Sequence, residues 1–501
     1  KLFCIYIKYN YKMIYDNIVI GSGISALGCV VGLLESNKKV LCIDGSDNTL
    51  ESFKNINNEE IVFDNDNLPL KKNSITAKFV NQFDPIELQN YPSFGGLSNI
   101  WGAKCLRLFK NQFDEWPISY DEIAKYYETC EKIMNVSHYN DELSKKLGVN
   151  ENIIDDSKIK LYSSFIKNFI KQKKTPVDFN IGLARLALDS KCYKCGNCFF
   201  GCPDNYIFDT KEYFNNLINK KKIEYKKNLI LERFILKDSV IELKFKNSQE
   251  TKIFAKKLFI GAGPIQTSNI IMNSMNKESD LNLAESQNYF VPCFYYGKNF
   301  DSNINNQTAG DAEIISNKNI KHDIGQLYFS IKYDQKLLKM VLKKKLGFLY
   351  NLIPNFLIKR IFITAGLINS NHSTYRAIIK KEDLSLHVIR DYEKEKKLKI
   401  EVFKQLNLLG KNYNFFAVNL LSKFCKFGRS FRLGCSVPML NEDEIKKNKN
   451  NNLYTKKNGE VSKFKNVYII DSSNFKNIPA GDISLTIMAN ALRIAIENKN
   501  D

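Results

Sequence analysis

Runs of apolar residues, separated by glycines and charged stretches, divide the chain into elements of predictable type. Near the N-terminus, residues 18–20 predict a buried strand, residues 30–34 part of a helix, and residues 40–43 a second strand. Further along, residues 256–274 predict a strand that leads through a Gly-Pro turn into a helix. Residues 484–498 are apolar at helical spacing without Gly or Pro, so they predict a buried helix.

Alternating apolar and polar residues in the middle of the chain point to a different kind of sheet. The runs "LSLHVIRD" (384–391) and "KLKIEVFK" (397–404) predict strands of an antiparallel sheet. Strand–helix–strand units at one end of the chain and alternating strands later on together predict a mixed fold of α/β and α+β parts.

A segment without acidic residues extends from 335 to 381, and much of it mixes Leu, Phe and Ile with Lys and Arg. Its longest uncharged run, 346–358, contains Pro354 and is too short to span a bilayer. Two interpretations stay open for residues 336–363. They lie at an anionic membrane surface, or they form a core helix pair with a solvated lysine face.

Composition limits the class of protein. With 501 residues, 44% of them hydrophobic, the chain can bury the cores of roughly two or three domains. The formal charge of +20 comes mostly from dispersed lysines and not from a compact basic element with interleaved aromatics, so we expect no nucleic-acid partner. The twelve cysteines do not form a secreted disulfide pattern, and the N-terminus does not resemble a secretory signal, which together predict a cytoplasmic protein. Residues 1–12 lack an initiator Met, so we expect them to be a fragment or upstream read-through and the working chain to start at Met13.

The first strand, the turn after it and the second strand carry a dinucleotide-binding pattern. The turn reads Gly21-x-Gly23-x-x-Ala26, and Asp44 follows the second strand. Glycines at these positions let the backbone approach a pyrophosphate at a helix N-terminus, and the acid can accept hydrogen bonds from a ribose hydroxyl. The pattern predicts a dinucleotide site without choosing between NAD and FAD.

The C-x5-C-x3-C spacing of Cys192, Cys198 and Cys202 resembles the bacterial sugar and glucoside dehydrogenase branch of the glucose–methanol–choline (GMC) family of FAD-dependent oxidoreductases. Four further stretches resemble the GMC family as a whole. They are "YPSFGGLSNIWGAKCLR" (91–107), "DEWPISYDEIAKYYETCEKIMNVS" (114–137), "KKLFIGAGPIQTSNIIMNS" (256–274) and "NVYIIDSSNFKNIPAGDISLTIMANALRIA" (466–495). The resemblance covers most of residues 15–275 and 428–498, with only a faint match between them.

The resemblance implies FAD as the cofactor and a Rossmann-type domain assembled from discontinuous segments. The FAD-binding domain would comprise 13–130, 191–275 and 455–501, and an α+β substrate domain with an antiparallel sheet would comprise 131–190 and 276–454. The residues that it places at the cofactor are Gly21, Gly23, Ala26, Asp44, Gly96, Ser98, Asn99, Trp101, Gly102, Gly263, Asp471 and Thr486.

This chain departs from the family at the catalytic positions. The family's proton-accepting His is replaced by Arg432, and Asp482 stands where a second His or Asn is usual. In one interpretation, Asp482 is the base or an orienting group and Arg432 stabilises the developing alkoxide. In the other, Asp482 only caps the last helix, and Arg432 pairs with it or faces solvent. His372 is a further candidate for the base.

A cysteine-rich loop, "KCYKCGNCFFGCPDN" (191–205), has the C-x2-C-x2-C-x3-C-P spacing of bacterial ferredoxins. The candidate ligands are Cys192, Cys195, Cys198 and Cys202. They would hold a [3Fe-4S] or [4Fe-4S] cluster that takes electrons from the flavin. Structural thiols are the main alternative, and zinc or disulfides fit the spacing and the compartment less well.

The resemblance and the residues together predict an FAD-dependent dehydrogenase that oxidises a CH–OH group of a sugar or glycoconjugate and passes electrons to an external acceptor. A lipid-linked sugar would suit a protein held peripherally at the inner face of the membrane. The alternatives are a flavoprotein whose substrate site has degenerated or that works as a reductase, and a membrane-peripheral binding protein in which FAD is structural.

Overall fold

The structure is a computed structural model. It describes residues 14–36, 38–46, 93–171, 179–193, 195, 198, 202–275, 279–298, 310–316, 326–332, 335–447 and 453–499, and the backbone of 75–80 and 85–90. The expectation about residues 1–12 and the histidine at position 322 lie outside the described residues.

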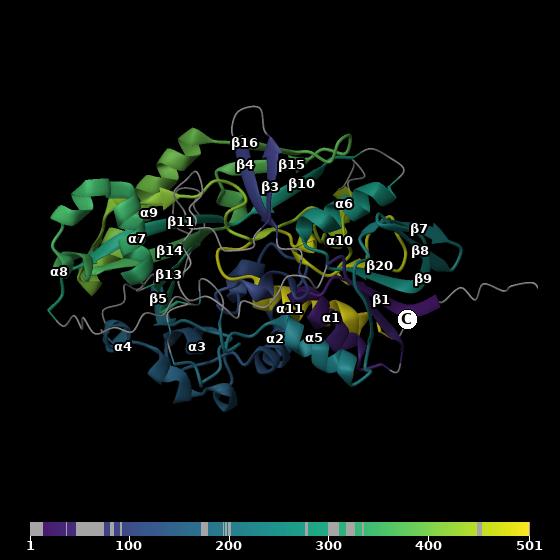
Figure 1. The fold of residues 1–501 in the computed structure, drawn as a ribbon, viewed down its shortest axis with the longest axis horizontal. Helices are drawn as coiled ribbons and strands as arrows, with labels where there is room; N and C mark the ends of the chain where they lie inside the picture. Colours follow the sequence, from purple (N-terminus) through teal and green to yellow (C-terminus); the bar gives the residue numbers. More distant parts are fainter. Residues whose placement is uncertain are drawn as a thin grey trace, which may run out of the picture.

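A mixed sheet at one end of the molecule (right in Figure 1) contains the dinucleotide-type unit. Its strand order is β6-β2-β1-β9-β8-β7, and β20 also pairs with β9. Strands β1 (Ile14–Ile20), β2 (Val40–Ile43), β6 (Glu224–Lys226), β9 (Ser248–Ile260) and β20 (Val467–Ile469) run parallel to one another. Strands β7 (Leu231–Lys237) and β8 (Val240–Phe245) extend the sheet beyond β9 by antiparallel pairing. Segments from both ends of the chain therefore meet in one sheet.

Helices cover both faces of this sheet. Helices α1 (Ile24–Leu33), α2 (Tyr120–Met134), α5 (Thr210–Asn219) and α11 (Ser484–Glu497) lie on one side and α6 (Pro264–Ser274) on the other (Figure 1). A side chain at Gly28 would meet Met488, and one at Gly32 would meet Leu492 and Ala495. Helices α1 and α11 therefore run in the same direction, with both N-termini at the carboxyl edge of the sheet.

Two larger antiparallel sheets lie in the remaining described part of the chain. The larger has the order β17-β11-β14-β13-β12-β5, with β18 also paired to β11, and the smaller has the order β16-β15-β10-β19. The strands of the larger sheet are β5 (Phe179–Leu183), β11 (Gln287–Tyr295), β12 (Ala312–Ser316), β13 (Leu327–Lys332), β14 (Ile361–Ile368), β17 (Phe415–Ala417) and β18 (Lys423–Phe424). Those of the smaller sheet are β10 (Leu281–Glu285), β15 (Tyr375–Ile379), β16 (Leu386–Arg390) and β19 (Leu433–Gly434). The expected fold class is confirmed, while the domain boundaries stay a prediction.

One of the two expected central strands is wrong. Residues 384–391 contain β16 as expected, but residues 397–404 lie inside the long helix α9 (Tyr392–Tyr413). Leu398, Val402 and Leu406 are buried at helical spacing, whereas Ile400 is exposed. The eight residues 397–404 alternate between polar and apolar side chains as a strand would. The helical period of apolar residues becomes visible only over the longer stretch that includes Leu406.

Shorter elements complete the described chain. They are the strands β3 (Ile75–Val80) and β4 (Pro85–Asn90), the helices α3 (Glu142–Lys146), α4 (Ser164–Lys171), α7 (Gln335–Leu346), α8 (Asn355–Ile358) and α10 (Glu442–Lys447), and short 3-10 turns. No helix among the described residues is both long enough and apolar enough to cross a membrane.

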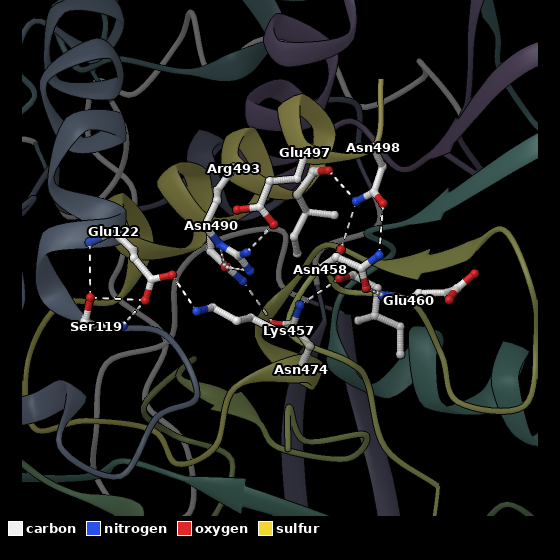
Figure 2. A network of polar contacts seen from close by, with 12 residues as sticks. Ser119, Glu122, Lys457, Asn458, Glu460, Asn474, Asn490, Arg493, Glu497 and Asn498 are labelled. Atoms are coloured by element: carbon white, nitrogen blue, oxygen red, sulfur yellow. Dashed lines mark hydrogen bonds and ion pairs between the residues drawn. The ribbon is translucent and has the colours of Figure 1, made fainter. Parts of the chain in front are cut away.

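A polar network fixes α11 against its surroundings (Figure 2). The fully buried Arg493 donates to Asn490 within the helix (3.1 and 2.9 Å) and pairs with Glu497 (2.7 Å). Just beyond the end of the helix, Asn498 and Asn458 exchange hydrogen bonds of 2.9 and 3.0 Å. These contacts satisfy polar groups that would otherwise be costly to bury, and they hold the helix against the loop before β20.

Candidate functional site

The turn between β1 and α1 is built to leave its outer face open. Gly21 has a φ of 105°, and a Cβ there would lie 2.4 Å from the carbonyl oxygen of Gly261, so no larger residue fits. Gly23 differs, because a Cβ at this position would have no atom of the described residues within 4 Å. Gly23 is the N-cap of α1 and gives the first N–H groups of the helix no side-chain hydrogen bond. The site thus fits the pyrophosphate of a dinucleotide.

A second glycine turn lies over the first. A Cβ on Gly96, whose φ is 55°, would be 3.5 Å from the Cα of Gly23. The side chain of Asn99 donates to the carbonyl oxygens of Phe94 (2.8 Å) and Gly96 (3.1 Å), and so shapes this turn from inside. The Ser98 hydroxyl donates to the carbonyl oxygen of Gly95 at 2.7 Å. Ser98 and Asn99 are therefore turn-forming residues in the geometry described.

Thr210, which sequence reasoning missed, joins the two turns. Its hydroxyl donates to the carbonyl oxygen of Ser22 at 2.8 Å, and its N–H donates to Ser98 Oγ at 3.0 Å. Thr210 is fully buried at the start of α5. A lone threonine has no sequence signal for this role, because the contact arises only when α5 meets the turns.

Asp44 lies at the end of β2, as the Rossmann pattern predicts. Its carboxylate accepts hydrogen bonds from the Ser22 hydroxyl and from the N–H of Ser46 (2.7 Å). The Ser22 hydroxyl in turn accepts from the N–H of Gly95 at 2.9 Å. Asp44 is thus oriented at the edge of the turns, and a carboxylate can accept more hydrogen bonds than these two.

Asp471 connects two other elements at the same edge of the sheet. Its carboxylate accepts from the N–H of Gly263 (3.0 Å), the hydroxyl of Thr267 (2.5 Å) and the N–H of Ser473 (2.9 Å). Burial raises the pKa of Asp471 despite these hydrogen bonds. A Cβ at Gly263 would meet nothing within 4 Å, so a second glycine also borders open space.

Three of the other residues expected at the cofactor make contacts within the protein. Trp101 donates from Nε1 to the carbonyl oxygen of Phe208 (2.7 Å), and the Thr486 hydroxyl lies 2.8 Å from the Tyr127 hydroxyl. Ala26 is fully buried in α1. Their assignment to the cofactor, like that of Gly102, stays a prediction.

A charged cluster lies just before the N-terminus of α11. The Asp482 carboxylate pairs with the Arg432 guanidinium and with Lys104 Nζ (3.1 Å). Lys104 also donates to the Tyr328 hydroxyl (3.1 Å) and Ser330 Oγ (3.2 Å), which uses all three of its protons. Arg432 donates to Asp482 and to the carbonyl oxygen of Ser430, and part of its side chain is exposed. It therefore keeps N–H donors for an incoming oxygen.

The proposed helix-cap role of Asp482 is wrong. The residue that caps α11 is Ile483, which offers no side-chain hydrogen bond, and Asp482 directs its carboxylate to Arg432 and Lys104 instead. Burial would raise the pKa of Asp482, but the charges of Lys104 and Arg432 outweigh burial and hold this pKa well below its usual range. Asp482 is thus a charged, weak base at neutral pH.

Two further residues that the sequence did not suggest extend the cluster inward. The Tyr328 hydroxyl lies 2.7 Å from an Asp482 carboxylate oxygen and 3.0 Å from one of Glu313. Glu313 is fully buried on β12, and burial, together with the Asp482 charge, raises its pKa to about 7 despite Lys104. The only sequence signal for Glu313 was a single acid within an apolar strand.

His372 occupies the 3-10 turn η6 (Ser370–His372), which lies against the segment that enters α11. Ser370 donates its N–H to the carbonyl oxygen of Ile478, and the N–H of Ile478 donates to Ser370 Oγ, both at 2.9 Å. The role of His372 as base stays a prediction.

The cysteine loop does not present a metal site in the described part of the chain. Cys195 is exposed, while Cys192, Cys198 and Cys202 are half-buried. Within the described residues, which include these four, no three His, Cys, Asp or Glu side chains are placed to hold a metal ion. Cys202 Sγ instead accepts the N–H of Tyr206 at 3.1 Å. The described residues thus give no support to an iron–sulfur cluster, and both the cluster and the structural-thiol alternative stay predictions.

We compared the sequence and the structure with known proteins. No protein-family model and no curated protein matches the sequence. The structure is similar to pyridoxine 4-oxidase from Mesorbium loti, with a TM-score of 0.62, 11% identity, and coverage of 97% of this chain and 99% of that one. The chain therefore shares the fold of that protein over nearly its whole length. At this identity the similarity concerns the fold, and it does not favour the sugar dehydrogenase branch.

Proposed function

We propose that the protein is an FAD-dependent oxidoreductase that oxidises a CH–OH group. The observation that carries the proposal is the open space beside Gly23, bordered by the uncapped N-terminus of α1 and the turn at Gly96. Gly21, Gly23 and Gly96 would admit the pyrophosphate, and Asp44 would accept a ribose hydroxyl. FAD, when bound, supplies the acceptor for the hydride of the alcohol carbon.

The charged cluster suits the other half of the reaction, which is removal of the hydroxyl proton. Arg432 would bind the alcohol oxygen and stabilise the negative charge that develops on it. The proton would enter at Asp482, which would then donate to the Tyr328 hydroxyl while that hydroxyl gives its own proton to Glu313. Glu313 would be the final acceptor, because its pKa of about 7 exceeds that of Asp482.

The substrate class follows less directly from the chain. A sugar or glycoconjugate remains our leading proposal, from the sequence resemblance, and an external electron acceptor would reoxidise the flavin. A hydroxymethyl group on an aromatic ring, as in pyridoxine, is the second candidate, because pyridoxine 4-oxidase shares the fold over nearly its whole length.

The test measures bound flavin first and its reduction second. Purified protein should be yellow, and anaerobic addition of the right alcohol, from a panel of sugars and pyridoxine, should bleach it. Gly23→Glu should remove the colour but keep the fold, because the new side chain enters the open space and repels the pyrophosphate. Ile14→Glu, at the exposed start of β1, is the matched control and should stay yellow. Colourless wild-type protein that FAD cannot reconstitute would refute the proposal.

A further inference from the structure

The segment after α7 exposes large apolar side chains although its base is firmly packed. Leu338 and Leu342 of α7 are buried against Ile358 of α8. Between these anchors, Phe348, Leu352 and Phe356 are 77%, 73% and 65% exposed, and Leu349 is also exposed. The exposure is therefore not a sign of a loose segment, since the same helices contribute a packed cluster beneath it.

A distant part of the chain adds to the same surface. Lys345 at the end of α7 donates to the carbonyl oxygen of Leu421 at 2.9 Å, and Leu421 packs against the buried cluster of α7. The preceding residue, Leu420, is 89% exposed. We call Phe348, Leu349, Leu352, Phe356 and Leu420 the apolar tip. Three of these residues lie in the 3-10 turn η5 (Gly347–Leu352) that follows α7, and Phe356 lies in α8. Helices α7 and α8 lie at the end of the molecule opposite β7 and β8 (Figure 1).

The charge around the apolar tip has one sign. The lysines of α7 described with their side chains are Lys339, Lys343, Lys344 and Lys345, and no described carboxylate lies within ion-pair distance of any of them. The sequence has no Asp or Glu between 335 and 381. Burial and the nearby charge of Lys423 lower the pKa of Lys345, which shows that positive groups crowd together here. A partner of this surface must bring negative charge.

We propose that the apolar tip inserts into the interface of an anionic lipid bilayer while the lysines of α7 bind lipid headgroups. Such a membrane offers both an apolar layer for Phe and Leu and a dense negative charge at the correct depth. A second copy of the chain suits the surface poorly, because a two-fold contact would place each lysine cluster against its equivalent. The proposal holds whether or not the protein binds FAD.

Vesicle sedimentation tests the proposal with the full-length chain. Wild-type protein should bind vesicles of equimolar phosphatidylcholine and phosphatidylglycerol, should not bind phosphatidylcholine alone, and should be released by salt. The triple variant Phe348→Ser/Leu352→Ser/Phe356→Ser should bind at least about tenfold more weakly. Lys343→Gln/Lys344→Gln should weaken binding by about fivefold for each lysine.

A matched control distinguishes binding by the apolar tip from non-specific binding by any exposed apolar side chain. Ile389→Ser/Ile400→Ser removes two similarly exposed apolar side chains from β16 and α9, and should bind like the wild type. Unfolding temperature checks that all variants keep the fold, which we expect because every replaced side chain is exposed. Three results would overturn the proposal. They are equal binding by the wild type and the triple variant, binding to neutral vesicles, and a wild-type dimer that is lost in the triple variant and in no other variant.

Discussion

Glu313 and Glu285 are two fully buried carboxyl groups in different surroundings, and burial raises the pKa of each to about 7. Glu285 accepts the N–H groups of Gly428 and Ser430, both at 2.9 Å. Glu313 lies beside the Tyr328 hydroxyl. Because a buried acid with a raised pKa favours the protonated form, its stabilising contribution is complete below the unfolded pKa of 4.5 and is lost as the pH rises towards 7.

The two residues provide a paired test of the proton path. We expect Glu313→Gln and Glu285→Gln each to remove part of the fall in the free energy of unfolding between about pH 5 and pH 7, by about 3 kcal/mol at most. Only Glu313→Gln should also flatten the pH dependence of flavin reduction, because only Glu313 contacts Tyr328. Urea unfolding and stopped-flow reduction across this pH range measure the two effects. A wild-type pH profile in Glu313→Gln would exclude it as the proton acceptor.

At the scale of elements, the N-cap glycine of α1, Gly23, and the glycine inside the helix, Gly28, have opposite surroundings. A Cβ at Gly28 would lie 2.3 Å from the carbonyl oxygen of Met488 on α11, whereas a Cβ at Gly23 would meet no described atom within 4 Å. Gly28 allows the two helices to pack closely, which brings both N-termini to the same edge of the sheet. Gly23 leaves room for the cofactor.

From these surroundings we expect a substitution at Gly28 to affect mainly the stability of the fold, and one at Gly23 to affect mainly FAD binding. Gly28→Ala should lower the free energy of unfolding of the apoprotein by about 2 kcal/mol, because backbone must move to admit the methyl group. Gly23→Ala should change it by less than about 1 kcal/mol yet weaken FAD binding, because its methyl group occupies the open space. Thermal unfolding and flavin titration measure the two quantities. Equal losses of stability in both variants would contradict this account.

At the scale of the whole molecule, the open question is whether electrons from the reduced flavin pass through the cysteine loop on their way to an external acceptor. No metal site is placed among the described side chains of this loop, and our proposal that reduced flavin passes electrons directly to an external acceptor can be tested against the cluster hypothesis. Protein purified without oxygen should then contain no iron, and Cys195→Ser and Cys198→Ser should keep wild-type turnover. Elemental analysis and an acceptor assay measure this. Iron that is present in the wild type and absent from Cys198→Ser would restore the cluster hypothesis.

Several parts of this protein were determined by the sequence alone, because each depends on neighbours along the chain. The strand, glycine turn and helix that contain Gly21 and Gly23 follow from a local apolar period and from backbone conformations that glycine permits. The same holds for α6 after Gly263 and for α11, whose predicted range of 484–498 differs from the observed end by one residue. Local order also predicted the position of Asp44 at the end of β2.

Only the tertiary structure decided the charged cluster and the surroundings of α11. Lys104, Glu313, Tyr328, Arg432 and Asp482 come from five separate segments, so no spacing along the chain could indicate their contacts. The pKa values of their carboxyl groups depend on burial and on charges brought together by folding, which is why one is lowered and another raised. Whether an alternating run becomes a strand or a face of α9 is likewise settled by what it packs against, since both conformations can bury the same apolar residues.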